Sequence, residues 1–256
     1  MTVSFVRLIK RYLKGGIIKD FAYEDTEEGS GQGSVCSPIL ANIYMHYILV
    51  WWFEECIVPK LKGYGGLVVY ADDFVVCFQY KEEAELFYEL LKKRMKIFGL
   101  EMEESKTRLI EFGRMAEQNR KARGERKPET FEFLGFTHYC SKSRRGWFRV
   151  KRKTSKKKFA KKCRELSQTM RAMRTWRLTD IFRKTNQILI GYYHYYGITD
   201  NGKSLQRMKR KVENLLYYWL NHRSQKRSYN WDGFLELLKA FPLAKPKIYV
   251  NIYQTG

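Results

Sequence analysis

The chain contains 256 residues and carries 49 lysines and arginines against 27 aspartates and glutamates, which gives a net charge of +22. With 44% hydrophobic and 16% aromatic residues, it is too rich in core-forming side chains to be a disordered basic tail. Residues 1–100 hold 12 basic and 13 acidic side chains, whereas residues 101–256 hold 37 and 14, so the two parts carry net charges of −1 and +23. This asymmetry predicts a polyanionic partner for the C-terminal part.

The sequence does not indicate a secreted, zinc-binding or membrane-spanning protein. The first residues show no basic segment followed by an apolar one, so we expect a protein of the cytosol or nucleoid. The five cysteines are widely spaced and the four histidines do not cluster with them, which argues against both disulfides and a zinc site. The charge-free run over 29–53 is dominantly apolar only over 39–53, shorter than the ~20 residues that a membrane span needs. A buried core helix is the better interpretation.

The hydrophobic periodicity predicts helices and strands mixed along the first 153 residues. In chain order we expect a helix over 4–14, a β-ribbon over 17–28, a helix over 38–58, strands over 67–69 and 74–78, a helix over 81–98 and a strand over 107–112. In the helix over 81–98, the side chains predicted to face inward are Ala84, Leu86, Phe87, Leu90, Leu91 and Met95. An exposed loop is expected over 114–130, and strands over 131–139 and 147–150.

From residue 154 the pattern becomes helical to the end of the chain. The predicted helices cover 155–173, 178–196, 204–224 and 231–240. The fold class is therefore α+β, with a mixed domain over 1–153 and an all-helical domain over 154–256.

Two adjacent carboxylates, Asp72 and Asp73, lie between two strongly apolar strand patterns. An isolated pair of aspartates is most often an ordinary turn. Here the flanking strands are too apolar for a surface ribbon, so a tight Asp-Asp turn is predicted to project from a buried sheet, where the carboxylates need a counter-charge. Mg²⁺ is the natural counter-charge, because it takes oxygen ligands from a few carboxylates plus phosphate. Two such ions support phosphoryl transfer.

Four motifs occur in the order found in one family of enzymes. Tyr70-Ala71-Asp72-Asp73 resembles the metal-binding hairpin of reverse transcriptases. Residues 29–42, GSGQGSVCSPILAN, resemble the loop and helix with which group II intron-encoded members contact nucleotide and template. The pair Lys106-Thr107 resembles the lysine segment after the palm helix, and residues 131–136, FEFLGF, resemble the strand that leads to the primer grip and thumb. Residues 190–197 and 219–229 also resemble the thumb of that family, its maturase-specific or X domain.

The chain thus resembles a group II intron reverse transcriptase/maturase. The resemblance implies a partial reverse-transcriptase palm, an antiparallel sheet with helices, followed by an all-helical thumb. It implies RNA-directed DNA polymerase activity by two-metal nucleotidyl transfer, with Mg²⁺ as cofactor, structured intron RNA and primer-template nucleic acid as partners, and a place in the bacterial cytosol. Asp72 and Asp73 would be the metal ligands and, with Lys106, the catalytic residues. The implied nucleotide- and template-binding residues are Gln32, Gly33, Ser37, Pro38, Tyr70 and Ala71.

A basic run at the predicted domain junction points to RNA without any help from the family. It consists of Lys151, Arg152, Lys153, Lys156, Lys157, Lys158, Lys161, Lys162 and Arg164. A charge run is usually a solvated face, but nine basic residues in fourteen with no acidic residue among them favour a phosphate backbone as ligand. The tyrosines at 192, 193, 195 and 196 are ambiguous, and helical spacing favours a core position over base stacking for most of them.

Two departures from the family pattern bear on activity. Ser30, Gly31 and Ser34 replace the usual residues around Gln32, and Gly31 loosens the loop that precedes it. Neither Asp20 nor Asp25 resembles the further metal-binding aspartate of the family, and nothing resembles its fingers, so we expect an incomplete two-metal site and no copying of nucleic acid by this chain alone. A second polypeptide would then supply the missing segment. The alternative is a non-catalytic, RNA-binding maturase fragment that assists intron folding and splicing.

Overall fold

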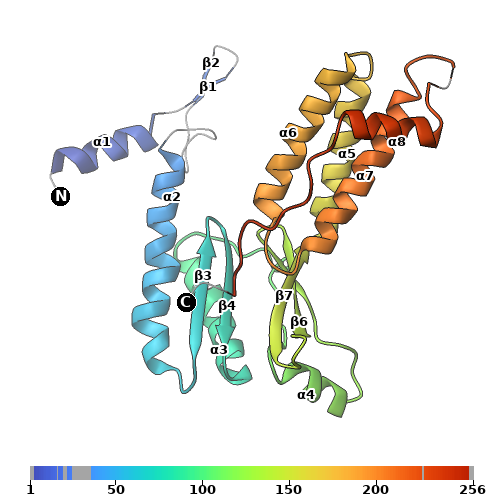
Figure 1. Ribbon diagram of the computed structural model, residues 1–256. Helices are drawn as coiled ribbons and strands as arrows, with labels where there is room; N and C mark the ends of the chain where they lie inside the picture. Colours follow the sequence, from blue (N-terminus) through green and yellow to red (C-terminus); the bar gives the residue numbers. More distant parts are fainter. Residues whose placement is uncertain (1–2, 16, 20–21, 25–35, 227, 254–256) are drawn as a thin grey trace. The chain divides into compact units, whose positions relative to one another are not determined.

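The computed structural model describes residues 3–15, 17–19, 22–24, 36–226 and 228–253. The chain forms two compact units, residues 1–109 and 110–256 (Figure 1). All the strand pairs in the described residues are antiparallel, and helices make up most of the remainder, which confirms the α+β class. No helix in these parts of the chain is long and apolar enough to cross a bilayer.

The first unit joins a long helical segment to a two-stranded hairpin and a second helix. Its elements are α1 (Val3–Leu13), β1 (Ile17–Lys19), β2 (Ala22–Glu24), α2 (Ser37–Met45), η1 (His46–Trp51), η2 (Phe53–Ile57), η3 (Val58–Lys60), β3 (Gly65–Tyr70), β4 (Asp73–Phe78) and α3 (Lys81–Ile97). The helix predicted over 38–58 is confirmed, although its η1 and η2 parts are π-helical. The expected burial is wrong for α2, which contains no buried residue, and is right only for residues of the later part such as Ile48, Leu49 and Phe53. Its Pro38 lies in the first turn of α2, where the missing amide hydrogen costs nothing.

Arg94 of α3 joins that helix to the π-helical part of the long segment. Its Nε donates to the carbonyl oxygen of Ile48 at 2.5 Å and its Nη2 to that of Tyr47 at 3.1 Å. The guanidinium carbon lies 4.8 Å from the ring centre of Trp52 and 4.9 Å from that of Phe98. A π-helix changes the pairing of backbone carbonyls, and Arg94 satisfies two of them from outside the helix.

The core of the first unit lies between these helices and one face of the hairpin. The buried residues are Ile48, Leu49, Trp52, Phe53, Ile57, Phe87, Leu91 and Met95. The hairpin contributes Leu67, Val69, Phe74, Val76 and Phe78, which alternate along the strands and so share a face. The predicted inward face of the helix over 81–98 is right for Phe87, Leu91 and Met95 but wrong for Leu86 and Leu90, which are exposed among the described residues.

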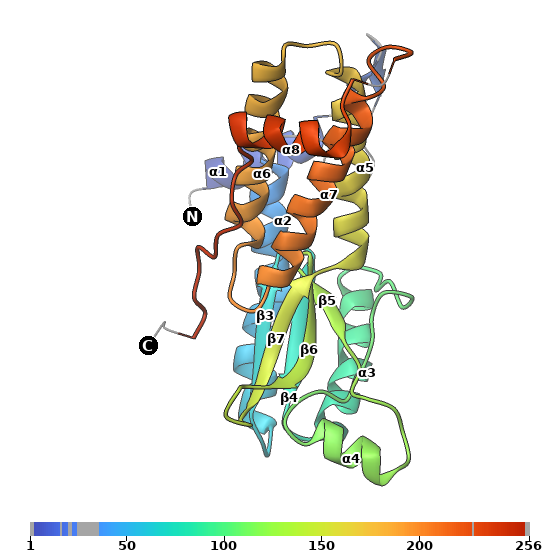
Figure 2. The same cartoon turned by 45° about the vertical axis from the view of Figure 1, so that its right-hand side comes forward.

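The second unit joins a three-stranded sheet to five helices, the last four of which pack together (Figure 2). Its elements are α4 (Ala116–Ala122), β5 (Phe131–Phe133), β6 (Phe136–Lys142), β7 (Phe148–Thr154), α5 (Lys156–Ala172), α6 (Leu178–Tyr196), α7 (Gly202–Leu220) and α8 (Trp231–Ala240). The helices α5 to α8 enclose a second core, with Leu166, Leu189, Met208, Val212 and Phe234 among its least exposed members. The predictions for α6 and α8 match to the residue.

Several predictions for residues 107–153 were wrong. No strand forms over 107–112, and the segment expected to be a loop over 114–130 contains α4, whose Ala116 is buried. The strand expected over 131–139 is interrupted by a turn at Leu134 and Gly135, both with positive φ, which is the geometry of a tight hairpin. The compact units divide at Leu109 and Ile110, whereas the predicted domain boundary at residue 153 stays a prediction.

Candidate active site and nucleic-acid interface

The tip of the β3–β4 hairpin carries the two predicted metal ligands. Tyr70 pairs with Asp73, so the two-residue turn consists of Ala71 and Asp72. The expected Asp-Asp turn is therefore wrong by one residue, because Asp73 already belongs to β4. Ala71 has φ +52°, a left-handed conformation that costs a residue with a Cβ about 1–2 kcal/mol. Such strain at a tip next to candidate ligands is typical of functional turns.

The two carboxylates of the tip differ in how the fold holds them. Asp73 lies opposite Tyr70, so both are on the hairpin face that points away from the core of the first unit. Asp72 belongs to the turn itself, and all three residues are exposed. The hairpin is thus buried on one face only within the described residues. No cluster of three or more possible metal ligands occurs anywhere in that part of the chain, so the pair lacks a third nearby acid there.

The other predicted palm residues are distributed along the first unit. Ser37 and Pro38 begin α2, and β3 returns antiparallel to the long helical segment, so the hairpin tip points back toward the end at which α2 begins (Figure 1). Lys106 is exposed on a turn in which its amide donates to the carbonyl of Glu103 at 3.0 Å. The Ser105 hydroxyl and the Lys106 ammonium lower the pKa of Glu103. Gln32 and Gly33 lie outside the described residues.

The basic run of the second unit is divided between a strand and a helix. Lys151, Arg152 and Lys153 belong to β7, where they lie opposite Tyr139, His138 and Thr137. Because side chains alternate along a strand, Arg152 is on the other face from its two neighbours. There it lies beside His138, whose pKa burial and the nearby guanidinium lower to about 4. The ammonium of Lys153 lies 5.1 Å from the ring centre of Tyr139.

The other six residues of the run belong to α5 and point in several directions. Ser155 caps the helix by accepting a hydrogen bond from the amide of Lys158 at 3.3 Å. Lys162 pairs with Glu165 at 3.4 Å and is half-buried. Lys156, Lys157, Lys158, Lys161 and Arg164 are exposed, and no salt bridge occupies them within the described residues. The fold therefore does not bring all nine residues onto one surface.

A shallow groove of about 510 Å³ runs between α5 and α6 beside this run. Its lining includes Lys158, Lys161, Lys162 and Tyr195. Tyr195 is 56% exposed and its hydroxyl donates to the carbonyl of Leu134 at 3.0 Å. Tyr192 and Tyr193 are buried in the core, and burial raises the pKa of Tyr192 to about 12. The predicted core role is thus confirmed for those two tyrosines, whereas Tyr195 is available to a ligand.

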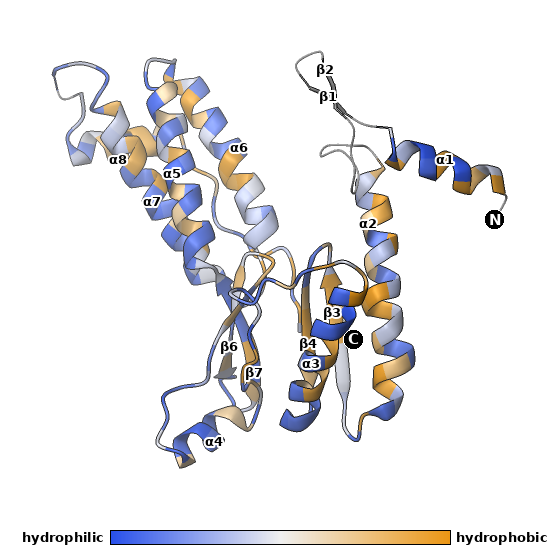
Figure 3. Cartoon of the chain, turned by 180° about the vertical axis from the view of Figure 1, so that it is seen from behind, coloured by the Kyte–Doolittle hydropathy of each residue, from blue (hydrophilic) through white to orange (hydrophobic). Residues whose placement is uncertain are grey.

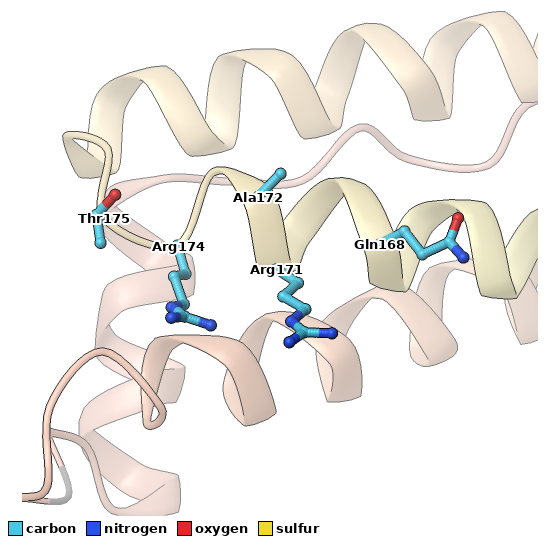
Figure 4. Close-up of a pocket in the computed structure, with 5 residues that line it drawn as sticks. All are labelled: Gln168, Arg171, Ala172, Arg174 and Thr175. Carbon is cyan, nitrogen blue, oxygen red and sulfur yellow. The ribbon is translucent and has the colours of Figure 1, made fainter.

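Sequence reasoning missed a second basic site at the C-terminal end of α5. Gln168, Arg171, Ala172, Arg174 and Thr175 line an open pocket of about 510 Å³. The guanidinium groups of Arg171 and Arg174 extend on the same side of the chain (Figure 4). The available signal was the i, i+4, i+7 spacing, which continues beyond Arg164 to Gln168 and Arg171.

Comparisons with known proteins identify the family of the chain. Residues 2–138 match the family described as reverse transcriptase (RNA-dependent DNA polymerase), and residues 156–233 match the group II intron, maturase-specific domain. The group II intron-encoded protein LtrA of Lactococcus lactis subsp. cremoris is 26% identical over 121 residues, covering 43% of this chain and 20% of LtrA. An uncharacterized 91 kDa protein in the cob intron of Schizosaccharomyces pombe is 43% identical over 44 residues, covering 17% of this chain and 6% of that protein. The chain thus spans only a small part of these relatives.

Proposed function

The chain belongs to the group II intron family of reverse transcriptases and maturases, and we propose that its first unit carries part of the site of an RNA-directed DNA polymerase. The observation that supports this most directly is the hairpin tip. A strained turn presents Asp72 to solvent, and the pairing with Tyr70 presents Asp73 on the open face. Both carboxylates are thereby free to meet a ligand while the opposite face is anchored in the core.

Enzymes of this family use divalent metal ions, and the tip fits such an ion in part. Mg²⁺ is commonly held by one or two carboxylates plus substrate phosphates, which is the donor set that Asp72 and Asp73 would complete. Held by Asp72 and Asp73, such ions would supply activation of an attacking oxygen and stabilisation of a leaving one. In the proposal, Tyr70 and Ala71 line the approach of the primer end, and Ser37 and Pro38, with Gln32 and Gly33, position nucleotide and template. Lys106 neutralises the departing pyrophosphate.

In this proposal, nucleotidyl transfer also depends on a further carboxylate. Two adjacent acids leave a pair of divalent ions under-coordinated, and the described residues offer no third acid nearby. We expect a fingers segment with a metal-binding aspartate, supplied as a second polypeptide, to raise nucleotidyl transfer strongly.

Primer extension on an RNA template with Mg²⁺ tests this function. The chain is assayed with and without a separately expressed fingers polypeptide from a group II intron reverse transcriptase, and the variants are Asp72→Asn and Asp73→Asn. Synthesis that needs the added polypeptide and disappears in both variants supports the proposal. Robust, Asp72-dependent synthesis by the chain alone would falsify the expectation that its two-metal site is incomplete. Synthesis that is insensitive to both variants contradicts the assigned role of the hairpin.

The second candidate function is binding of structured intron RNA without catalysis. It is favoured by the surplus of 37 basic over 14 acidic residues in 101–256 and by the exposed lysines of α5. The basic run over 151–164 would then contact the phosphate backbone. Affinity for intron RNA that persists in the Asp72→Asn/Asp73→Asn double variant, without nucleotidyl transfer under any condition, would select this function. Affinity that is nearly independent of salt would exclude it.

A further inference from the structure

The β6–β7 hairpin carries a regular series of side chains on one face, here called the β7 stripe. It consists of Trp147, Arg149, Lys151 and Lys153. These residues share a face because side chains alternate along a strand. The residues of β6 that lie opposite the three cations are Ser141, Tyr139 and Thr137. The face thus combines one aromatic ring with three cations at intervals of two residues.

Trp147 is held on an ordered turn and yet lies in solvent. The amide of Ser143 donates to the carbonyl of Trp147 at 2.7 Å, and the amide of Trp147 donates to the Ser143 hydroxyl at 3.1 Å. Gly146 closes the turn with φ +84° and donates to the carbonyl of Ser143 at 3.1 Å. The indole is 74% exposed, more than any other tryptophan, and makes no ring contact within the described residues. A large ring fixed in this way is typical of a binding surface, because its apolar face gains from being covered.

The cations of the stripe have no acidic partner among the described residues. No salt bridge joins any of the three to a carboxylate there. Instead, the guanidinium carbon of Arg149 lies 4.1 Å from the ring centre of Tyr253, and the ammonium of Lys153 lies 5.1 Å from that of Tyr139. The carboxylate of Asp200 accepts a hydrogen bond from the Tyr253 hydroxyl at 2.5 Å. Ring faces orient the cations without using their N–H donors, which therefore remain available to an anionic ligand.

The tip of the hairpin is remote from the helices of the second unit. β6 begins after the turn of Leu134 and Gly135, where the Tyr195 hydroxyl of α6 donates to the carbonyl of Leu134. Its seven residues then extend for about 24 Å to the opposite end, at which Trp147 lies. Figure 3 shows the two strands running away from α5 to α8. The stripe is therefore a site distinct from the helices and from the turn that resembles the approach to the primer grip.

The chemistry of the stripe favours an unpaired segment of nucleic acid. Proteins that bind single strands combine a cationic track with aromatic rings on which bases stack. Trp147 offers such a ring, and Arg149 can bind phosphate through two parallel hydrogen bonds. In a double helix the bases cover one another, whereas the bases of an unpaired segment can turn outward and stack on an aromatic side chain. A duplex would thus leave Trp147 unused.

We propose that the β7 stripe binds an unpaired segment of RNA, with one base stacked on Trp147 and successive phosphates on the three cations. The inference rests on the RNA-binding function proposed above and names the form of RNA that this sheet takes. It gives Lys151 and Lys153 a ligand of their own and leaves out Arg152, which lies on the other face. It adds Trp147 and Arg149, which lie outside the predicted basic run.

Fluorescence polarisation tests the stacking step on the full chain. The probes are a labelled, mixed-sequence single-stranded RNA of about 12 nucleotides and a blunt duplex of the same sequence. Trp147→Ala should weaken single-strand binding about tenfold and change duplex binding less than about twofold, because only an unpaired base stacks. Trp147→Phe keeps a ring and should recover most of the affinity. The matched control Tyr64→Ala removes a ring that is 72% exposed in the first unit, and should leave both affinities unchanged.

A salt titration and a crosslink test the rest of the stripe. Each lost phosphate contact with a single strand reduces the slope of log affinity against log salt by about 0.7, so Arg149→Gln/Lys153→Gln should lower the slope by about 1.4. The control Lys81→Gln/Lys93→Gln removes two exposed charges of α3 and should keep the wild-type slope. A single strand that contains 4-thiouridine should crosslink at or next to Trp147. All the substituted side chains are exposed, so thermal midpoints should equal that of the wild type.

The outcomes separate this inference from the function on which it rests. Absence of salt-dependent RNA binding by the wild-type chain overturns both. Strong wild-type binding with equal affinities for Trp147→Ala and Tyr64→Ala, or with crosslinks only outside residues 139–153, overturns the β7 stripe alone. Equal losses for single strand and duplex, or Trp147-dependent binding of poly-glutamate, also overturn it. A loss confined to the single strand and recovered in Trp147→Phe supports it.

Discussion

Replacement of Asn201 by alanine is expected to destabilise the second unit more than any exposed polar substitution. Asn201 is fully buried where β7 ends and α7 begins. Its Oδ1 accepts the amide of Thr154 at 2.8 Å, and its Nδ2 donates to the Thr154 hydroxyl at 2.9 Å and to the carbonyl of Tyr196 at 2.8 Å. One side chain thus connects the last residues of β7 and of α6 to the first turn of α7.

The magnitude follows from these three hydrogen bonds. Each contributes about 0.5–1.5 kcal/mol net, so their loss costs about 3 kcal/mol. The amide of Thr154 is then left buried with one partner fewer, so the cost does not fall below this middle value of the range. For a domain of this size, each kcal/mol lowers the midpoint by roughly 2–4 °C, so we expect a decrease of about 6–12 °C in the transition of this unit.

Differential scanning calorimetry measures this transition directly, and Asn186→Ala is the matched control. Asn186 also makes two hydrogen bonds, to the carbonyl of Pro242 at 3.0 Å and from the amide of Ala244 at 2.8 Å, but water reaches its site. We expect a loss of about 1 kcal/mol or less there, because water replaces the lost partners. Equal midpoints for the two variants would show that burial of the Asn201 network has no special energetic role.

Three further predictions concern the interior of the two units. Arg94→Lys removes the second hydrogen-bond donor and the stacking of the guanidinium on Trp52. In urea titrations, this variant should lower the unfolding free energy of the first unit by about 2 kcal/mol. The control Lys93→Arg, on the exposed side of the helix, should leave that free energy unchanged. Gly135→Ala forces a Cβ into a turn with φ +77° and to within 3.1 Å of the Tyr196 hydroxyl. Thermal unfolding should therefore show a loss of about 1–2 kcal/mol in the free energy of unfolding. An unchanged free energy of unfolding would contradict the left-handed turn. Burial and Arg152 lower the pKa of His138 to about 4, so the unfolded chain binds a proton at this residue more readily than the folded chain does. The free energy of unfolding should therefore fall as the pH drops from about 6.5 to 4. In His138→Gln, the unfolding midpoint should lose this part of its pH dependence.

Some structural features depend on the local sequence pattern, and others depend on contacts with residues distant in the chain. Helices over 178–196 and 231–240 match to the residue because caps and a 3.6-residue period are local properties of the chain. The register of the hairpin is not local. The pairing of Tyr70 with Asp73 depends on which side chains of β3 and β4 meet the core, and it moved the turn from Asp72–Asp73 to Ala71–Asp72. Leu86 and Leu90 fit a helical stripe equally well, but no element within the described parts of the chain buries them.

By itself, the sequence determined the family, the α+β class, the two candidate carboxylates and the basic character of the second half. These properties reside in residue identity and spacing, which do not depend on contacts distant in the chain. Only the tertiary structure decided that Asp73 faces away from the core, that β7 places Arg152 on the opposite face from Lys151 and Lys153, and that α5 aligns Lys157 through Arg171 on one exposed line. The reason is that a charge becomes available to a partner when packing leaves it uncovered and unpaired, and packing is decided by elements far apart in sequence.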